Sequence, residues 1–132
     1  MDASLQVTLF FTAVFVVLSV PMSVSVGLRR AKTGISMLHG DDDDLLRRIR
    51  AHGNFVEYVP LALIALAGAE VAGAPAWFLM SCGTTLLVGR LFHYVAFRRT
   101  NNSTGRAIGA FLTSLATIGL GVAILVGLAS KL

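Results

Sequence analysis

Long uncharged stretches alternate with short polar segments along this chain. The two terminal stretches contain no charged residue between Asp2 and Arg29 or between Arg106 and Lys131. A helix that crosses a bilayer needs about 20 predominantly apolar residues in succession. The pattern therefore predicts one spanning helix at each end of the chain. The expected bounds of these two helices are residues 5–28 and 105–130.

Two further apolar stretches lie in the middle of the chain, and each contains a few polar residues. The first begins near Asp44 and continues well past Pro60, and the second contains Arg90 and His93. A Gly-Ala-Pro sequence at residues 73–75 predicts a tight turn between them. The expected bounds of these two helices are 44–72 and 75–98.

The four segments predict an all-α integral membrane protein in which residues 1–132 form one domain, a bundle of four transmembrane helices. Most basic residues lie in or beside the expected loops at 29–43 and 98–105. The positive-inside rule places these loops in the cytoplasm and both termini on the opposite side. We expect the acidic run 41–44 to be solvated, with Asp43 or Asp44 capping the second helix.

Composition agrees with a membrane protein and narrows the possible functions. Hydrophobic residues make up 55% of the 132 residues and charged residues 14%, whereas soluble domains carry about 25% charged residues. The net charge of +4 comes from residues at the ends of apolar spans, so we do not expect a nucleic-acid partner. The single cysteine, Cys82, excludes an intramolecular disulfide and suits a packing role. No His/Cys set has metal-ligand spacing.

A polar stripe runs along the expected second helix. At about 100° per residue, Arg47, Arg50, Asn54 and Glu57 share one face, and Tyr58 flanks it. Ionisable side chains at membrane depth are costly and usually serve a function. Guanidinium groups bind carboxylates in a bidentate manner, and Glu57 suits an ammonium group or an arginine of another helix.

The third helix carries a second polar face, because Arg90, His93 and Phe97 are spaced by three and four residues. Other basic side chains lie at the same end of the bundle, namely Arg29 and Arg30 on the first helix and Arg106 on the last. Together these residues predict a mostly cationic pocket for a ligand with two carboxylates and one amine. The alternatives are a structural Glu57–Arg90 ion pair and a packing role for His93.

These residues resemble a known family. The pattern Arg50-Ala51-His52-x-Asn54-x-x-Glu57-x-x-Pro60 is similar to the signature of the membrane-associated proteins in eicosanoid and glutathione metabolism, the MAPEG family. Three weaker matches accompany it along the chain: Arg29-Arg30-Ala31, Gly89-Arg90-x-x-His93, and Arg106 sixteen positions after Arg90. The short loops are most like those of the small bacterial members, which implies a bacterial inner membrane.

The resemblance implies a homotrimer of four-helix bundles with glutathione, the co-substrate, bound in the membrane between neighbouring subunits. The residues implied to hold glutathione are Arg29, Arg50, Asn54, Glu57, Tyr58 and His93, and we add Arg30, Arg47 and Arg90 from their positions. Arg106 is implied to be catalytic and to stabilise the glutathione thiolate. The thiolate would then attack a lipophilic small molecule, an electrophile or a hydroperoxide, that arrives through the membrane lipid.

Two positions depart from the eicosanoid-producing members. Phe97 stands where those members often have tyrosine, and Ala107 stands where the prostaglandin branch has serine. The departures argue against a specific eicosanoid synthase and leave open a general glutathione transferase or peroxidase. One alternative is a non-catalytic binding or scaffolding protein that retains the pocket. The other is a small proton-coupled exporter, which the uncharged first span and the arginines near Glu57 disfavour.

Overall fold

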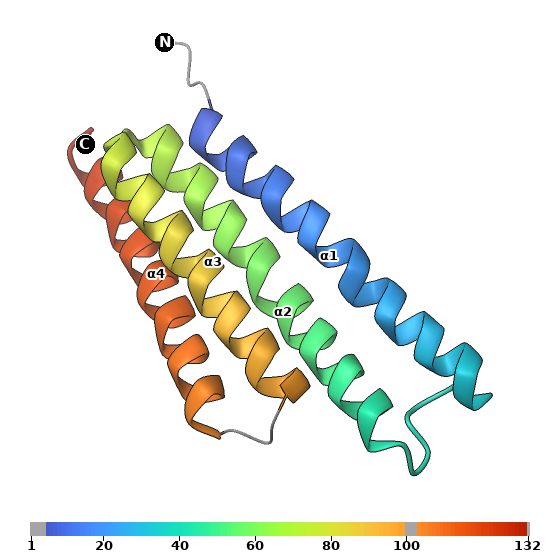
Figure 1. Cartoon of the computed structure of the whole chain (residues 1–132). Helices are drawn as coiled ribbons and strands as arrows, with labels where there is room; N and C mark the ends of the chain where they lie inside the picture. Colours follow the sequence, from blue (N-terminus) through green and yellow to red (C-terminus); the bar gives the residue numbers. More distant parts are fainter. Residues whose placement is uncertain (1–4, 100–102, 132) are drawn as a thin grey trace.

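The computed structural model describes residues 5–99 and 103–131, and the regular structure in these ranges is α-helical. The helices are α1 (Gln6–Thr33), α2 (Asp43–Ala72), α3 (Ala76–Arg99) and α4 (Ser103–Ala129). Helices α2, α3 and α4 pack together, and α1 lies along α2 on the side away from α4 (Figure 1). The predicted all-α bundle is confirmed.

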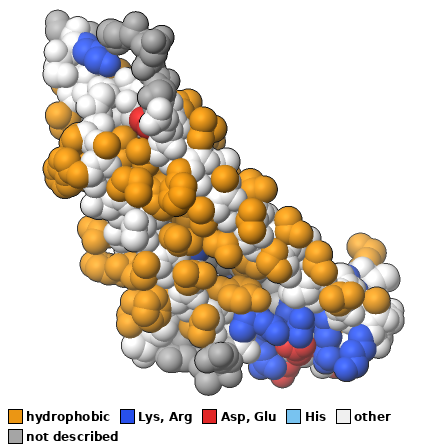
Figure 2. Space-filling view, turned by 45° about the horizontal axis from the view of Figure 1, so that its top comes forward, with side chains coloured by type: hydrophobic (Ala, Val, Ile, Leu, Met, Phe, Trp, Pro, Cys, Tyr) orange, Lys and Arg blue, Asp and Glu red, His pale blue; other side chains and the backbone are white. Residues whose placement is uncertain are grey.

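All four helices are long and apolar enough to cross a membrane. The shortest, α3, has 24 residues, which at 1.5 Å per residue gives about 36 Å against a hydrocarbon core of roughly 30 Å. Large apolar side chains cover much of the outer surface along the helices (Figure 2). Such a surface is costly in water and suited to lipid, so the predicted membrane fold is confirmed.

Helix α1 extends past its predicted end at Leu28 and ends at Thr33. The uncharged stretch stops at Arg29, but arginine and lysine are good helix formers. The helix therefore continues until Gly34, which adopts a left-handed φ of 72° and donates its amide to the carbonyl of Arg30. The end of an apolar stretch thus marks the edge of the hydrocarbon layer and not the end of the helix.

The start of α2 corrects the prediction that Asp43 or Asp44 caps this helix. The cap is Asp42, which has an extended backbone (φ −98°, ψ 97°) and accepts a hydrogen bond from the amide of Leu45 at 2.6 Å. At the other end, Gly73 has a φ of 96° and closes α2. The turn predicted at residues 73–75 is confirmed. Helix α3 continues to Arg99 and α4 begins at Ser103, inside the range 98–105 expected as a loop, and residues 100–102 lie outside the described residues.

Aromatic and branched side chains from all four helices form the core. Its largest fully buried apolar side chains are Phe11, Phe15, Leu45, Leu66, Leu79, Leu86 and Leu120. Cys82 is buried in the same cluster, as its predicted packing role requires. A Cβ atom on Gly127 would lie 2.7 Å from the carbonyl oxygen of Ala72. This glycine therefore permits close contact between α4 and α2 within the chain.

The carboxylate of Glu70, near the end of α2, caps the first turn of α1. Oε1 accepts from the amide of Val7 at 3.0 Å, and Oε2 accepts from the amide and hydroxyl of Thr8 at 2.8 and 2.7 Å. The first amides of a helix lack intrahelical acceptors, and the helix dipole favours a negative charge there. One helix therefore fixes the end of another, a contact that was not predicted from the sequence.

Candidate functional site

Arg90 lies at the centre of the polar cluster that α2, α3 and α4 share. Its side chain is buried, and its Nη1 donates to Oδ1 of Asn54 on α2 at 2.5 Å. Its Nη2 donates to the carbonyl of Gly109 on α4 at 3.3 Å. Its guanidinium carbon also lies 5.4 Å from the ring centroid of Tyr58. The cluster therefore joins three helices through one guanidinium group.

Two glycines allow α4 to approach Arg90 closely enough for this contact. A Cβ atom on Gly109 would lie 2.7 Å from the carbonyl oxygen of Gly89, so the two helices meet backbone to backbone. The carbonyl of Gly109, which is buried, accepts both from Arg90 and from the hydroxyl of Thr113, at 3.3 and 2.8 Å. The Nε of Arg90 is buried and has no hydrogen-bond partner in the described part of the chain.

An aromatic contact connects the remaining members of the cluster on α3 and α4. The ring of His93 lies 5.0 Å from the ring of Phe97, and the guanidinium carbon of Arg106 lies 5.2 Å from the same Phe97 ring. His93 is buried, whereas Arg106 is partly exposed. Phe97 thus holds the proposed catalytic arginine by a cation–π contact, which is favourable within about 6 Å.

The charged members of the polar stripe of α2 face outward, whereas Asn54 turns inward. Arg47, Arg50 and Glu57 are exposed, and Tyr58 is 48% exposed although its ring contacts Arg90. The alternative of a structural Glu57–Arg90 ion pair is wrong in this chain. Asn54 takes the guanidinium group of Arg90, while Glu57 lies on the outer face and forms no ion pair with the described residues.

Arg29 and Arg30 lie apart from this cluster and bind the segment that connects α1 to α2. Arg29 forms an ion pair with Asp42 at 2.8 Å and a longer one with Asp44 at 3.4 Å. Arg30 donates to the carbonyls of Ile35 and Leu38 at 3.2 and 2.9 Å. The structure therefore gives both arginines partners within their own chain.

Asp42 and Asp44 of the acidic run form ion pairs and are partly buried, which corrects the expectation that the whole run is solvated, whereas Asp41 and Asp43 are exposed as expected. Asp44 pairs with Arg48 at 2.9 Å and with Arg98 at 3.0 Å, in addition to Arg29. These contacts tie α1, α2 and α3 together at one end, where Figure 2 shows positive and negative side chains side by side. The hydrogen bond from Arg29 lowers the pKa of the Asp42 carboxyl below its ordinary value, helped by the amide of Leu45.

Sequence reasoning did not assign these partners to Asp42 and Asp44, and it did not single out Arg48. A signal was present, because Asp44 and Arg48 are four residues apart and therefore neighbours on a helix. The ion pair from Asp44 to Arg98 joins positions 54 residues apart. The position of Arg98 beside α2 follows only from how α3 packs, so the sequence alone gave no basis for that pair.

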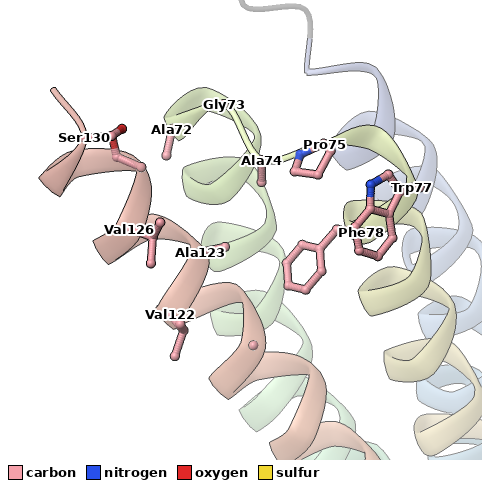
Figure 3. A pocket seen from close by; sticks show the side chains of 12 residues that line it. Ala72, Gly73, Ala74, Pro75, Trp77, Phe78, Val122, Ala123, Val126 and Ser130 are labelled. Carbon is pink, nitrogen blue, oxygen red and sulfur yellow. The ribbon is translucent and has the colours of Figure 1, made fainter.

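A large cavity lies at the opposite end of the molecule from the polar cluster around Arg90. It is a groove of about 590 Å³ between the start of α3 and the last turns of α4, lined mainly by apolar side chains such as Trp77, Phe78 and Val126 (Figure 3). A smaller cavity of about 120 Å³ lies among α1, α2 and α3 and includes Arg90 in its lining. Only the smaller cavity belongs to the polar cluster.

Comparison with known proteins shows the family to which this chain is related. The model of the MAPEG family matches residues 8–126, which include all the cluster residues named above. The inner membrane protein YecN of Escherichia coli strain K12 is 38% identical over 90 residues, covering 65% of this chain and 69% of that protein. Inner membrane protein YecN of Escherichia coli O6:H1, strain CFT073, has the same identity and coverage.

Proposed function

The chain belongs to the MAPEG family, and on this basis we propose that it is a glutathione-dependent membrane enzyme. The proposed reaction is conjugation of glutathione to lipophilic electrophiles, or reduction of lipophilic hydroperoxides by glutathione. One observation carries the proposal: charged side chains of α2 face outward on a helix that is long and apolar enough to span a membrane. These are Arg47, Arg50 and Glu57.

The exposed carboxylate of Glu57 gives the strongest physical argument for a covered polar site on α2. Glu57 lies seven residues after Arg50, the last residue of the charged start of α2, and therefore about 10 Å further along the helix. An exposed carboxylate at this depth is expensive in lipid, and such groups usually face a protein partner or a polar ligand. We infer that a neighbouring copy of the chain covers this face and that a polar ligand lies between the copies.

Glutathione suits the available groups. It carries two carboxylates, one ammonium group and a thiol, and guanidinium groups such as those of Arg47 and Arg50 bind carboxylates well. Glu57 is free to accept from the ammonium group. Arg90 is buried with only neutral acceptors among the described residues, so an anionic ligand nearby would compensate a charge that is otherwise costly.

Arg106 is the proposed stabiliser of the reacting sulfur. A free thiol has a pKa near 8.5, and its thiolate is the nucleophile. A fixed positive charge favours the thiolate, and arginine cannot serve as a base because its guanidinium group keeps its proton. In conjugation, a sulfur lone pair forms the new C–S bond while the leaving group departs with its electrons, or a proton from water completes an addition.

Hydroperoxide reduction uses the same thiolate. The sulfur attacks the terminal peroxide oxygen, the O–O bond breaks, and the alkoxide leaves and is protonated to an alcohol. The resulting glutathione sulfenic acid reacts with a second glutathione to give the disulfide and water. No step requires a hydroxyl group at Phe97, so the departure at this position is compatible with both reactions.

Calorimetric titration of glutathione into the detergent-purified protein tests the binding step. We expect saturable binding that Arg50→Ala weakens by about 10-fold or more, because loss of a charge-assisted hydrogen bond costs about 1.5–3 kcal/mol. Lys131→Ala, which removes an exposed cation at the other end of the molecule, is the matched control and should bind normally.

The outcomes of this titration separate the proposed functions. Absence of binding at millimolar glutathione overturns the proposal. An equal loss of glutathione affinity in Arg50→Ala and Lys131→Ala refutes the role of Arg50. Binding without turnover of any electrophile or hydroperoxide favours the non-catalytic alternative.

A further inference from the structure

The segment between α1 and α2 contains an unusual backbone conformation at a leucine. Three described residues of this segment have positive φ: Gly34 at 72°, Leu38 at 55° and Gly40 at 53°. Among the described residues, Leu38 is the one residue other than glycine that has a positive φ. A leucine there costs free energy that glycine avoids, because its Cβ crowds the following carbonyl oxygen.

The side chain of Leu38 gains no compensating burial within the chain. Leu38 and its neighbour Met37 are each 79% exposed. Ile35, in contrast, turns inward, and its Cδ1 lies 3.2 Å from the position that a Cβ on Gly40 would occupy. The segment therefore packs one apolar side chain beneath itself and presents two others outward.

Arg30 holds these outward side chains beside the end of α1. One nitrogen, Nη1, donates to the carbonyls of both Ile35 and Leu38, at 3.2 and 2.9 Å. Because an arginine in the last turns of α1 reaches both acceptors, Leu38 lies near the level of these turns. The adjacent Arg29 is the first charged residue after the apolar part of α1. Leu38 is thus placed where the hydrocarbon layer gives way to lipid headgroups.

We propose that this segment anchors the protein to the membrane surface by inserting Met37 and Leu38 into the boundary between headgroups and acyl chains. Burial of two large apolar side chains in that boundary is favourable. The free energy gained by this burial offsets the cost of the positive φ at Leu38. The exposed Lys32, in the last turn of α1, suits the phosphates of anionic lipids at the same level.

Depth measurement on the full-length protein in vesicles of phosphatidylethanolamine and phosphatidylglycerol tests the anchor. Cys82→Ala removes the native thiol, and single variants Met37→Cys and Leu38→Cys then carry a nitroxide spin label. Asp41→Cys, in the same segment and also exposed, is the control. We expect the labels at 37 and 38 to collide more with membrane-dissolved oxygen than with a water-soluble nickel chelate, and the label at 41 to show the reverse.

Two results would overturn the anchor. Equal access of the nickel chelate to positions 38 and 41 would mean that Leu38 lies in water. Protection of positions 37 and 38 from both oxygen and nickel would mean that protein covers them, either a second copy or another partner. Met37 is not among the residues with positive φ, so Met37→Cys keeps the test valid even if Leu38→Cys fails to fold.

Discussion

Arg106 stacks on Phe97 and forms no ion pair with the described residues. Its charge is therefore available to a ligand. We expect Arg106→Ala to lower the rate of glutathione conjugation by about 100-fold or more, the usual cost of removing one preorganised electrostatic contact. Glutathione affinity should change little, because the carboxylate and ammonium contacts remain. Steady-state kinetics with a lipophilic electrophile, together with calorimetry, measures both effects.

Arg106→Lys is the matched control for this prediction. It keeps the positive charge but loses the planar guanidinium group that stacks on Phe97, so an intermediate rate is expected. The near-ultraviolet absorbance of bound glutathione thiolate gives a separate readout of the same charge, and it should fall in Arg106→Ala. Equal rates in the alanine variant and the wild type would refute the assigned role.

Helix periodicity predicts which side chains of α2 lie near one another. Arg50 and Glu57 of the predicted stripe are both exposed, whereas Asn54 turns to Arg90 on α3. Periodicity does not say which neighbour a side chain meets, and Arg90 binds Asn54 instead of Glu57. That choice depends on the rotation of α3 and on the approach of α4 at Gly109, neither of which a single sequence reveals.

At the scale of elements, Asp42 has two separable roles: it caps α2 and pairs with Arg29. Its pKa is lowered in the folded protein, chiefly by the hydrogen bond from Arg29. A lowered carboxyl pKa contributes stability that is present above the unfolded value, near 3.9, and is lost as the pH falls through the folded value. Thermal unfolding in detergent should therefore show a midpoint that declines on acidification.

Asp42→Asn tests this linkage because asparagine is also a good helix cap. The variant should be less stable than the wild type at neutral pH, and the difference should shrink as the pH falls below about 4. Asp43→Asn, an exposed neighbour without an ion pair among the described contacts, is the control and should follow the wild type. A pH-independent difference for Asp42→Asn would mean that capping, and not the ion pair, accounts for its effect.

The presence of the four helices could be predicted from the sequence. The residues at which they begin and end could be predicted less well. Four uncharged or nearly uncharged stretches sufficed to locate the spans, because lipid demands about 20 apolar residues for each. The ends depend on local groups that hydropathy does not describe, such as Gly34 after α1 and Asp42 before α2. The cap that Glu70 provides for α1 joins residues 62 and 63 positions apart, so it required the tertiary structure.

At the scale of the whole molecule, the outer face of α2 suggests how copies of the chain meet. Arg50 and Glu57 are followed on this face by Leu61 and Ile64, at spacings of seven, four and three residues. Such spacings are typical of helices that pack against helices, yet Leu61 and Ile64 are 62% and 69% exposed in the single chain. A partner helix from another copy would bury this apolar continuation and also shield Glu57 from lipid.

The family resemblance implies that three copies meet in this way, so we expect a native mass of three copies of 14.0 kDa by mass spectrometry from detergent micelles. In a Cys82→Ala background, Ile64→Cys should form disulfides between copies on oxidation, because the proposed arrangement brings the outer faces of α2 together around the symmetry axis. Val17→Cys, equally exposed but on α1, should remain free. A monomeric mass, or equal cross-linking at both positions, would contradict this arrangement. It would leave the exposed carboxylate of Glu57 without the subunit that makes its position in the membrane tolerable.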